Sequence, residues 1–312
     1  MDITGGVTFT GGLSIAGPPP PNSYKAIFGY GSTNPAITNL VSNTGVVATD
    51  TAGVGTTRSD LAAAAYGTDK AIFGYGLTWS AGTTNISNKV SNAGVVATDT
   101  TGVGTARYAL AAAGYGTDKA IFGFGGGAGS YSLTNLVSNA GVVATDTTGV
   151  GTARSLLAAA GYGTDKAIFG YGSIGGAGAT AITNLVSNTG VVATDTTGVG
   201  TARRRLAAAG YGTDKAIFGY GDDASATRVS TTNLVSNTGV VGNDVTGVGM
   251  ARYELAAAGY GTDKAIFGYG IGDASAVVSI TNLVSNTGVV ASNTTGVGTA
   301  RYGLAAASYG LS

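Results

Sequence analysis

The chain has 312 residues, 44% of them hydrophobic, and its 16 basic residues balance 16 acidic ones. It contains no cysteine and no histidine, which excludes disulfides, Cys₂His₂ zinc sites and histidine-dependent catalytic triads or dyads. The lack of a basic excess argues against nucleic-acid binding. No segment resembles a signal peptide, and no apolar run approaches the roughly 18 residues needed to cross a bilayer.

The first 23 residues stand apart from the rest of the sequence. The segment MDITGGVTFTGGLSIAG predicts a small hairpin with Val7, Phe9, Leu13 and Ile15 as its apolar side chains, and four prolines at 18–21 predict a stiff spacer. Two strands alone are marginal in water, so we expect them to order by adding to another chain. We therefore predict an anchoring arm over residues 1–23, with a disordered tail as the alternative.

Residues 24–312 consist of six nearly identical units. The segment KAIFGYG, or a close variant, begins at Lys25, Lys70, Lys119, Lys166, Lys215 and Lys264. An arginine followed by LAAA closes each unit, at Arg58, Arg107, Arg154, Arg203, Arg252 and Arg301. Repeats of this length predict a solenoid or propeller architecture.

Each unit predicts four short β-strands. They are LAAAGYG, KAIFGYG, TNLVSN and a fourth within GVVATDTTGVGTAR, with Gly-Thr-Asp and Asn-Thr-Gly turns between strands one and two and between three and four. Small alanines suit strands that converge on an axis. The Gly residues in FGYG predict aromatic rings packed on the backbone of a neighbouring sheet.

The ends of the repeat region predict ring closure. The first unit starts on its second strand, and residues 301–310 supply a lone LAAASYG with no KAIFGYG after it. We therefore predict an all-β, six-bladed β-propeller with four-stranded blades, in which the C-terminal strand completes the first blade. A β-solenoid is the competing fold, but its coils are usually shorter and it needs no matching incomplete ends.

The order of these elements resembles the kelch repeat. An arginine, a small-apolar strand, a turn, a strand ending in glycines and a variable loop recur over residues 24–310. Gly-Tyr-Gly replaces the usual Gly-Gly, and the usual tryptophan of the fourth strand is missing. The resemblance implies the propeller fold and does not carry a function.

The leader resembles the N-termini of tailed-bacteriophage structural proteins, in which ITGG, TFTGG and PPP segments precede a displayed domain. This resemblance implies a virion-associated protein, assembled in the host cytoplasm, that contacts other virion proteins through its arm.

The repeated polar residues are interpreted as scaffold. Asp50, Asp99, Asp146, Asp195 and Asp244 recur in every unit but the last and are expected to pair with the repeated arginines or to cap turns. The Asp-Lys pairs of the Gly-Thr-Asp-Lys turns are expected to be solvated charges. These glycine-rich turns resemble phosphate loops but contain no GxxxxGK[ST] sequence, so we interpret them as turns. A calcium or acid-base role for Asp222, Asp223 and Asp273 is a weaker alternative.

Variation between units is concentrated in the loops after strand two and in the two residues after each arginine. Antiparallel order places both zones on one face of the ring, as in proteins that carry binding loops on a rigid scaffold. The alternative is neutral drift of unconstrained loops. The candidate binding residues on this face, with exposed aromatics expected among them, are Trp79, Tyr108, Tyr131, Arg204, Arg205, Arg228, Tyr253, Glu254 and Tyr302.

These features favour a non-enzymatic virion protein that displays a variable face for host adsorption, with a host glycan or protein as partner. A decoration protein that only stabilises the particle and a lectin-like bacterial surface propeller are the alternatives. We expect no cofactor and no bound metal, because a kelch-type copper oxidase site would need histidine and cysteine.

Overall fold

The computed structural model describes residues 25–32, 36–175 and 177–310. The arm predicted over residues 1–23, with Val7, Phe9, Leu13 and Ile15, lies outside these residues. The regular elements of the described chain are almost all β-strands, as expected, and most of them form six three-stranded antiparallel sheets. Its one helical turn is the 3-10 helix η1 (Asp273–Ser275).

Each three-stranded sheet has an inner, a middle and an outer strand. The inner strands are β22 (Ala305–Tyr309), β3 (Ala62–Tyr66), β6 (Ala111–Tyr115), β9 (Ala158–Tyr162), β15 (Ala207–Tyr211) and β19 (Ala256–Tyr260). The middle strands are β1 (Lys25–Gly29), β4 (Lys70–Thr78), β7 (Lys119–Gly123), β10 (Lys166–Gly170), β16 (Lys215–Gly219) and β20 (Lys264–Gly268). The outer strands are β2 (Thr38–Val41), β5 (Gly82–Val90), β8 (Thr134–Val137), β13 (Thr183–Val186), β18 (Thr232–Val235) and β21 (Thr281–Val284).

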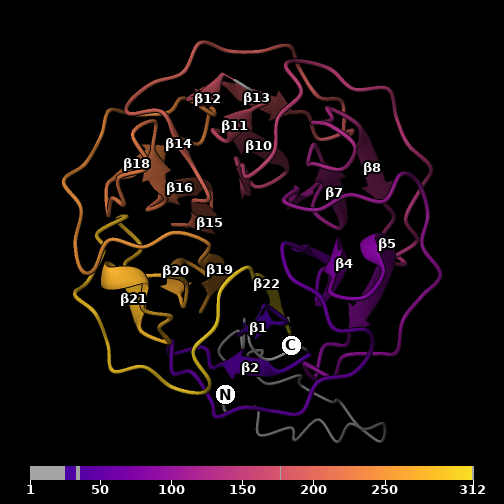
Figure 1. Ribbon diagram of the computed structural model, residues 1–312, viewed down its shortest axis with the longest axis horizontal. Helices are drawn as coiled ribbons and strands as arrows, with labels where there is room; N and C mark the ends of the chain where they lie inside the picture. Colours follow the sequence, from indigo (N-terminus) through magenta and orange to yellow (C-terminus); the bar gives the residue numbers. More distant parts are fainter. Residues whose placement is uncertain (1–24, 33–35, 176, 311–312) are drawn as a thin grey trace, which may run out of the picture.

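The six sheets lie around a common axis (Figure 1). Their inner strands contact one another in the cyclic order β22, β3, β6, β9, β15, β19 and back to β22. Four short strands add two small sheets near the loops: β11 (Ser173–Ile174) with β12 (Gly178–Ala179), and β14 (Arg203–Arg204) with β17 (Asp222–Asp223).

The C-terminal strand completes the first sheet, and this part of the prediction is confirmed. Strand β22 pairs antiparallel with β1, from Lys25 opposite Tyr309 to Gly29 opposite Ala305. Figure 1 shows the two strands side by side near the ends of the described chain. The same register joins the inner and middle strands of the other sheets.

The prediction of four strands per sheet is wrong. The segment after each outer strand pairs with it only through isolated bridges, such as Val41 with Val47 and Thr38 with Thr51. Between these bridges, the side-chain amide of Asn39 donates to the carbonyl oxygen of Ala48 and to the carboxylate of Asp50. Three residue steps on the outer strand face four on this segment, so the register shifts between the bridges and a continuous fourth strand does not form.

The sheets interlock through aromatic rings that lie on glycine, as the FGYG pattern predicts. A Cβ atom built on Gly29 would lie 2.6 Å from the ring of Phe73 in the next sheet. The same contact recurs in the five other sheets, and its last member places Phe28 on Gly268, which links the sixth sheet to the first. Six buried clusters of alanine, isoleucine, valine and aromatic residues lie between the sheets and form the core.

Membrane-spanning helices are not found among the residues that the structure describes.

Candidate functional site

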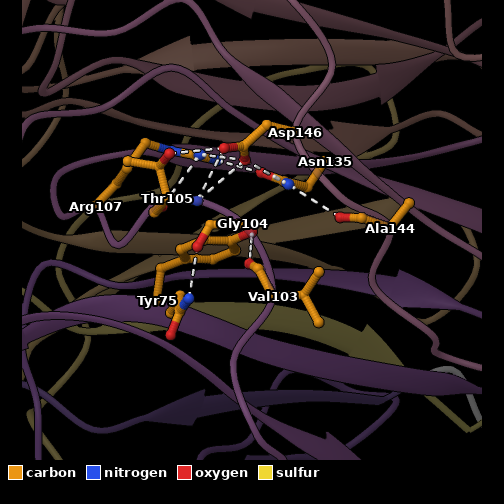
Figure 2. A network of polar contacts seen from close by, with 9 residues as sticks. Tyr75, Val103, Gly104, Thr105, Arg107, Asn135, Ala144 and Asp146 are labelled. Atoms are coloured by element: carbon orange, nitrogen blue, oxygen red, sulfur yellow. Dashed lines mark hydrogen bonds and ion pairs between the residues drawn. The ribbon is translucent and has the colours of Figure 1, made fainter.

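The repeated arginines are structural. Arg107 is fully buried, its guanidinium lies 4.7 Å from the centre of the Tyr75 ring, and it donates to the Asn135 side chain at 2.6 Å. Asp146 accepts bonds from the backbone and hydroxyl of Thr105 and from Asn135 (Figure 2). Burial by itself raises the pKa of Asp146, but these hydrogen bonds hold it below its usual range. The network therefore joins one sheet to the next, which confirms the scaffold interpretation of the recurring aspartates.

A second group of charged residues lies outside the repeated positions. Twelve of the 16 basic residues occupy the repeated lysine and arginine positions, which leaves Lys89, Arg204, Arg205 and Arg228. Three of these four lie together with three of the six acidic residues that are not part of the repeat. We name this group the axial cluster; it consists of Asp60, Arg204, Arg205, Asp222, Arg228, Tyr253 and Glu254.

The two variable zones meet, as antiparallel order predicts. Backbone bridges join Ser59 to Leu77, Tyr108 to Gly126, Ser155 to Ser173 and Tyr253 to Ile271, and β14 pairs with β17. We call the side of the ring that carries these zones the variable face. The side that carries the Gly-Thr-Asp and Asn-Thr-Gly turns is the turn face, where Asn139 of one turn donates to Asp118 of the other.

A ring of six backbone hydrogen bonds places the second variable residue of each unit beside the axis. Each N–H donates to the carbonyl of the preceding unit at 2.7–3.0 Å, and Asp60 closes the ring by donating to Gly303. All six residues have a positive φ of 50–61°; they are Asp60, Ala109, Leu156, Arg205, Glu254 and Gly303. They and the six leucines that follow them line a small cavity of about 80 Å³.

Ion pairs join four of the six charged side chains of the axial cluster. Asp222, whose side chain is only 3% exposed, accepts from Arg204 at 2.9 Å and lies 3.7 Å from Arg205. Arg205 also lies 3.1 Å from the carboxylate of Glu254. One oxygen of Asp222, Oδ1, is buried without a hydrogen-bond partner.

Two carboxyl groups of the axial cluster have raised pKa values. Burial, followed by repulsion from Asp60, raises the pKa of Glu254 to about 7 against the attraction of Arg205. Burial also raises the pKa of Asp60, despite its hydrogen bond from Ser59 and the charge of Arg205. Perturbed carboxyl groups of this kind gather at functional sites more often than elsewhere.

Arg228 extends the axial cluster outward along the variable face. Its guanidinium lies 5.2 Å from the centre of the Tyr253 ring, and Arg205 lies 5.3 Å from the same ring. The Arg228 guanidinium also donates to the Ser275 hydroxyl at 2.9 Å. No carboxylate lies within ion-pair distance of Arg228 among the residues described.

The predicted binding residues fall into two groups. Arg204, Arg205, Arg228, Tyr253 and Glu254 come together in the axial cluster. The other four stand apart from it: Trp79, Tyr108, Tyr131 and Tyr302.

Burial separates the predicted aromatic residues. Trp79, at the tip of the β4–β5 hairpin, is 74% exposed. The tyrosines Tyr108, Tyr131, Tyr253 and Tyr302 are only half-buried, so the expectation of freely exposed tyrosines is wrong. Two of these rings lie on loop glycines: a Cβ on Gly127 would lie 2.8 Å from Tyr131, and one on Gly126 would lie 3.4 Å from Tyr108.

Two members of the axial cluster were missed as binding candidates. Asp60 occupies the same repeat position as Arg205 and Glu254, so alignment of the units provides the signal that would have found it. Asp222 was considered only as a calcium or acid-base residue. Within the described ranges, no group of three or more potential metal ligands is present.

No protein-family model matches the chain, and no curated protein matches its sequence.

Proposed function

We propose that the six sheets form a kelch-like, six-bladed β-propeller that serves as a non-enzymatic binding protein on a phage particle. In this proposal the variable face adsorbs to the host surface, and the arm over residues 1–23 attaches the ring to other virion proteins. The cyclic contacts between inner strands and the pairing of β22 with β1 support the propeller. The leader resemblance supports the virion setting.

The axial cluster is the observation that carries the binding role. A scaffold built from six copies distributes its structural charges evenly, whereas these residues occur once and gather at one place. Ion pairs and stacking fix the orientation of Arg204 and Tyr253 before any ligand arrives. Pre-ordered aromatic and arginine side chains are the usual anchors of binding surfaces.

Binding to host surface polysaccharide and to whole host cells tests the proposal. We expect Arg228→Ala and Tyr253→Ala each to weaken binding by about tenfold or more, since truncating an anchor costs about 1–2 kcal/mol. Lys89→Ala is the matched control, because Lys89 is the remaining non-repeat cation and lies on β5, where it donates to the Ala140 carbonyl. Unchanged binding in both cluster variants would refute the role of the variable face.

The site of the protein on the particle is tested separately. Removing residues 1–23 should leave the ring folded and abolish its incorporation into the particle. Normal incorporation of the trimmed chain, seen by low-resolution imaging of the particles, would refute the anchor. Incorporation without any host binding by the full chain would favour the decoration alternative.

A further inference from the structure

The centre of the ring contains a second cavity, which opens on the turn face. It has a volume of about 350 Å³ and is lined by the inner strands and by the Gly-Thr-Asp-Lys turns. Its volume falls within the range of small-molecule sites. It shares no lining residue with the small cavity of the axial cluster, and the six leucines that follow the backbone ring lie between the two.

Small side chains keep this cavity open. Along β9, Ala158, Ala160 and Tyr162 are buried between sheets, whereas Ala159 and Gly161 are half-buried and face the axis. Four of the six inner strands place glycine at the position of Gly161, where the others have Ala65 and Ser308.

The lining of the cavity is cationic and rich in hydroxyl groups. It includes four lysines and five threonines and no carboxylate. The lysines are Lys119, Lys166, Lys215 and Lys264, and the threonines are Thr68, Thr117, Thr164, Thr213 and Thr262.

The neighbouring aspartates belong to the turns rather than to the cavity lining. Asp118 accepts from Lys119 at 3.0 Å and from Asn139, which follows the outer strand β8. The lysine side chains are 43–44% exposed, and each ammonium has two further N–H donors beyond its aspartate. The first unit has Tyr24 in place of the aspartate before Lys25, so six repeated lysines face five aspartates in the sequence.

The donor set selects among anions. The cavity lining offers several compact ammonium groups around one axis and contains no arginine, whose planar fork would bind single carboxylate or phosphate groups in a fixed geometry. Lysine binds phosphate as a point charge, and several phosphate groups on one small molecule would meet several lysines at once.

We propose that the central cavity binds a small molecule that carries more than one phosphate group. The glycine-rich turns, which lack the sequence of a phosphate loop, would thus form one shared site at the axis instead of six separate ones. This site is independent of the variable face and of the proposed adsorption role.

Titration calorimetry of the full chain with tripolyphosphate at low ionic strength tests this proposal. We expect saturable binding to one site that weakens steeply with added salt, because exposed charges are screened. No binding heat at low salt would overturn the proposal. Citrate is the comparison anion, and citrate binding as tight as tripolyphosphate would overturn the assignment to phosphate.

Two variants should change the affinity for tripolyphosphate in opposite directions. The triple change Lys119→Gln, Lys166→Gln and Lys215→Gln should weaken tripolyphosphate binding by about tenfold or more, because three exposed ion pairs between lysine and phosphate are lost. The triple change Asp118→Asn, Asp165→Asn and Asp214→Asn should tighten it, because the lysines lose their competing partners. Loss of folding cannot produce tighter binding, so the second variant keeps the test decisive.

Lys89→Gln is the matched control, since Lys89 does not line the cavity. It should bind tripolyphosphate as the parent chain does. Equal affinity in the parent and in both triple variants would place the bound anion elsewhere and overturn the proposal.

Discussion

At the residue scale, each buried arginine depends on an aromatic ring in an unusual backbone conformation. Tyr30, Tyr75, Phe124, Tyr171, Tyr220 and Tyr269 all have a positive φ of 62–65°, which is rare for aromatic residues. In five units the tyrosine hydroxyl donates to a valine carbonyl at 3.0–3.1 Å. These bonds, together with the arginine stacked on the ring, hold the residue in this conformation.

The third unit has Phe124 in this position and lacks the hydroxyl. We expect Phe124→Tyr to raise the free energy of unfolding by about 1 kcal/mol, because the new hydroxyl would donate to the Val150 carbonyl. Tyr75→Phe is the mirror control and should lower it by a similar amount. Urea denaturation measures both, and destabilisation by Phe124→Tyr would show that the third unit differs from the others around this ring.

A second residue-scale prediction concerns Glu254, whose pKa rises from 4.5 to about 7 on folding. Between these values the unfolded chain has lost the proton and the folded chain keeps it, so stability falls as pH rises. The contribution is fully present below about pH 4.5 and is lost above about pH 7. Arg205, Asp60 and Asp222 are the charged groups that act on this carboxyl.

Glu254→Gln removes this titration. Relative to the parent, we expect the variant to gain stability between pH 5 and pH 8, by up to about 3 kcal/mol. Working above pH 5 avoids the repeated aspartates such as Asp146, whose lowered pKa values act in the opposite direction at acidic pH. Urea denaturation of both proteins at the two pH values measures the gain, and a constant difference between them would contradict the prediction.

At the element scale, strand β22 closes the ring of sheets by pairing with β1. It supplies the inner strand of the first sheet from the far end of the sequence, and Ala305, Ala307 and Tyr309 are buried there. It also contacts β19 and β3, the inner strands on either side. Its removal would expose one edge of β1 and two neighbouring core clusters.

Deleting residues 304–312 should therefore lower the melting temperature strongly or make the chain insoluble, because an open sheet edge invites aggregation. A synthetic peptide with the deleted sequence should restore the melting temperature in a concentration-dependent way. The same peptide with Ala307→Asp is the control and should not, since Ala307 is 4% exposed. A truncated chain with the melting temperature of the parent would refute the role of β22 in closing the ring.

At the scale of the whole molecule, the repeat determined how much could be predicted. The six units, the incomplete ends and the Phe-on-Gly packing follow from the sequence, because each depends on residues that recur at fixed spacing. The missing fourth strand could not be predicted in this way, because the sequence does not show that the side chain of Asn39, on the outer strand β2, bonds to Asp50 in the segment that follows. The axial cluster was found only in part, because its members lie on different units and are brought together by the ring of backbone bonds and by the pairing of β14 with β17.

A cyclic arrangement makes a prediction that no open stack of repeats would share. Residues Lys25 and Tyr309 are paired in the same register as Lys166 and Tyr162, which a Gly-Thr-Asp turn connects. The chain break between β22 and β1 should therefore be interchangeable with any of the five intact turns.

A permuted chain would join Gly310 to Lys25 through a Thr-Asp linker and begin at Lys166, ending at Asp165. We expect it to unfold in one cooperative transition, within about 1 kcal/mol of a linear chain of residues 25–310, because one turn closes where another opens. Urea denaturation monitored by fluorescence and by circular dichroism measures both chains. In an open stack the joined ends would lie far apart and the permuted chain would not fold, so its failure, with the linear chain stable, would refute the ring.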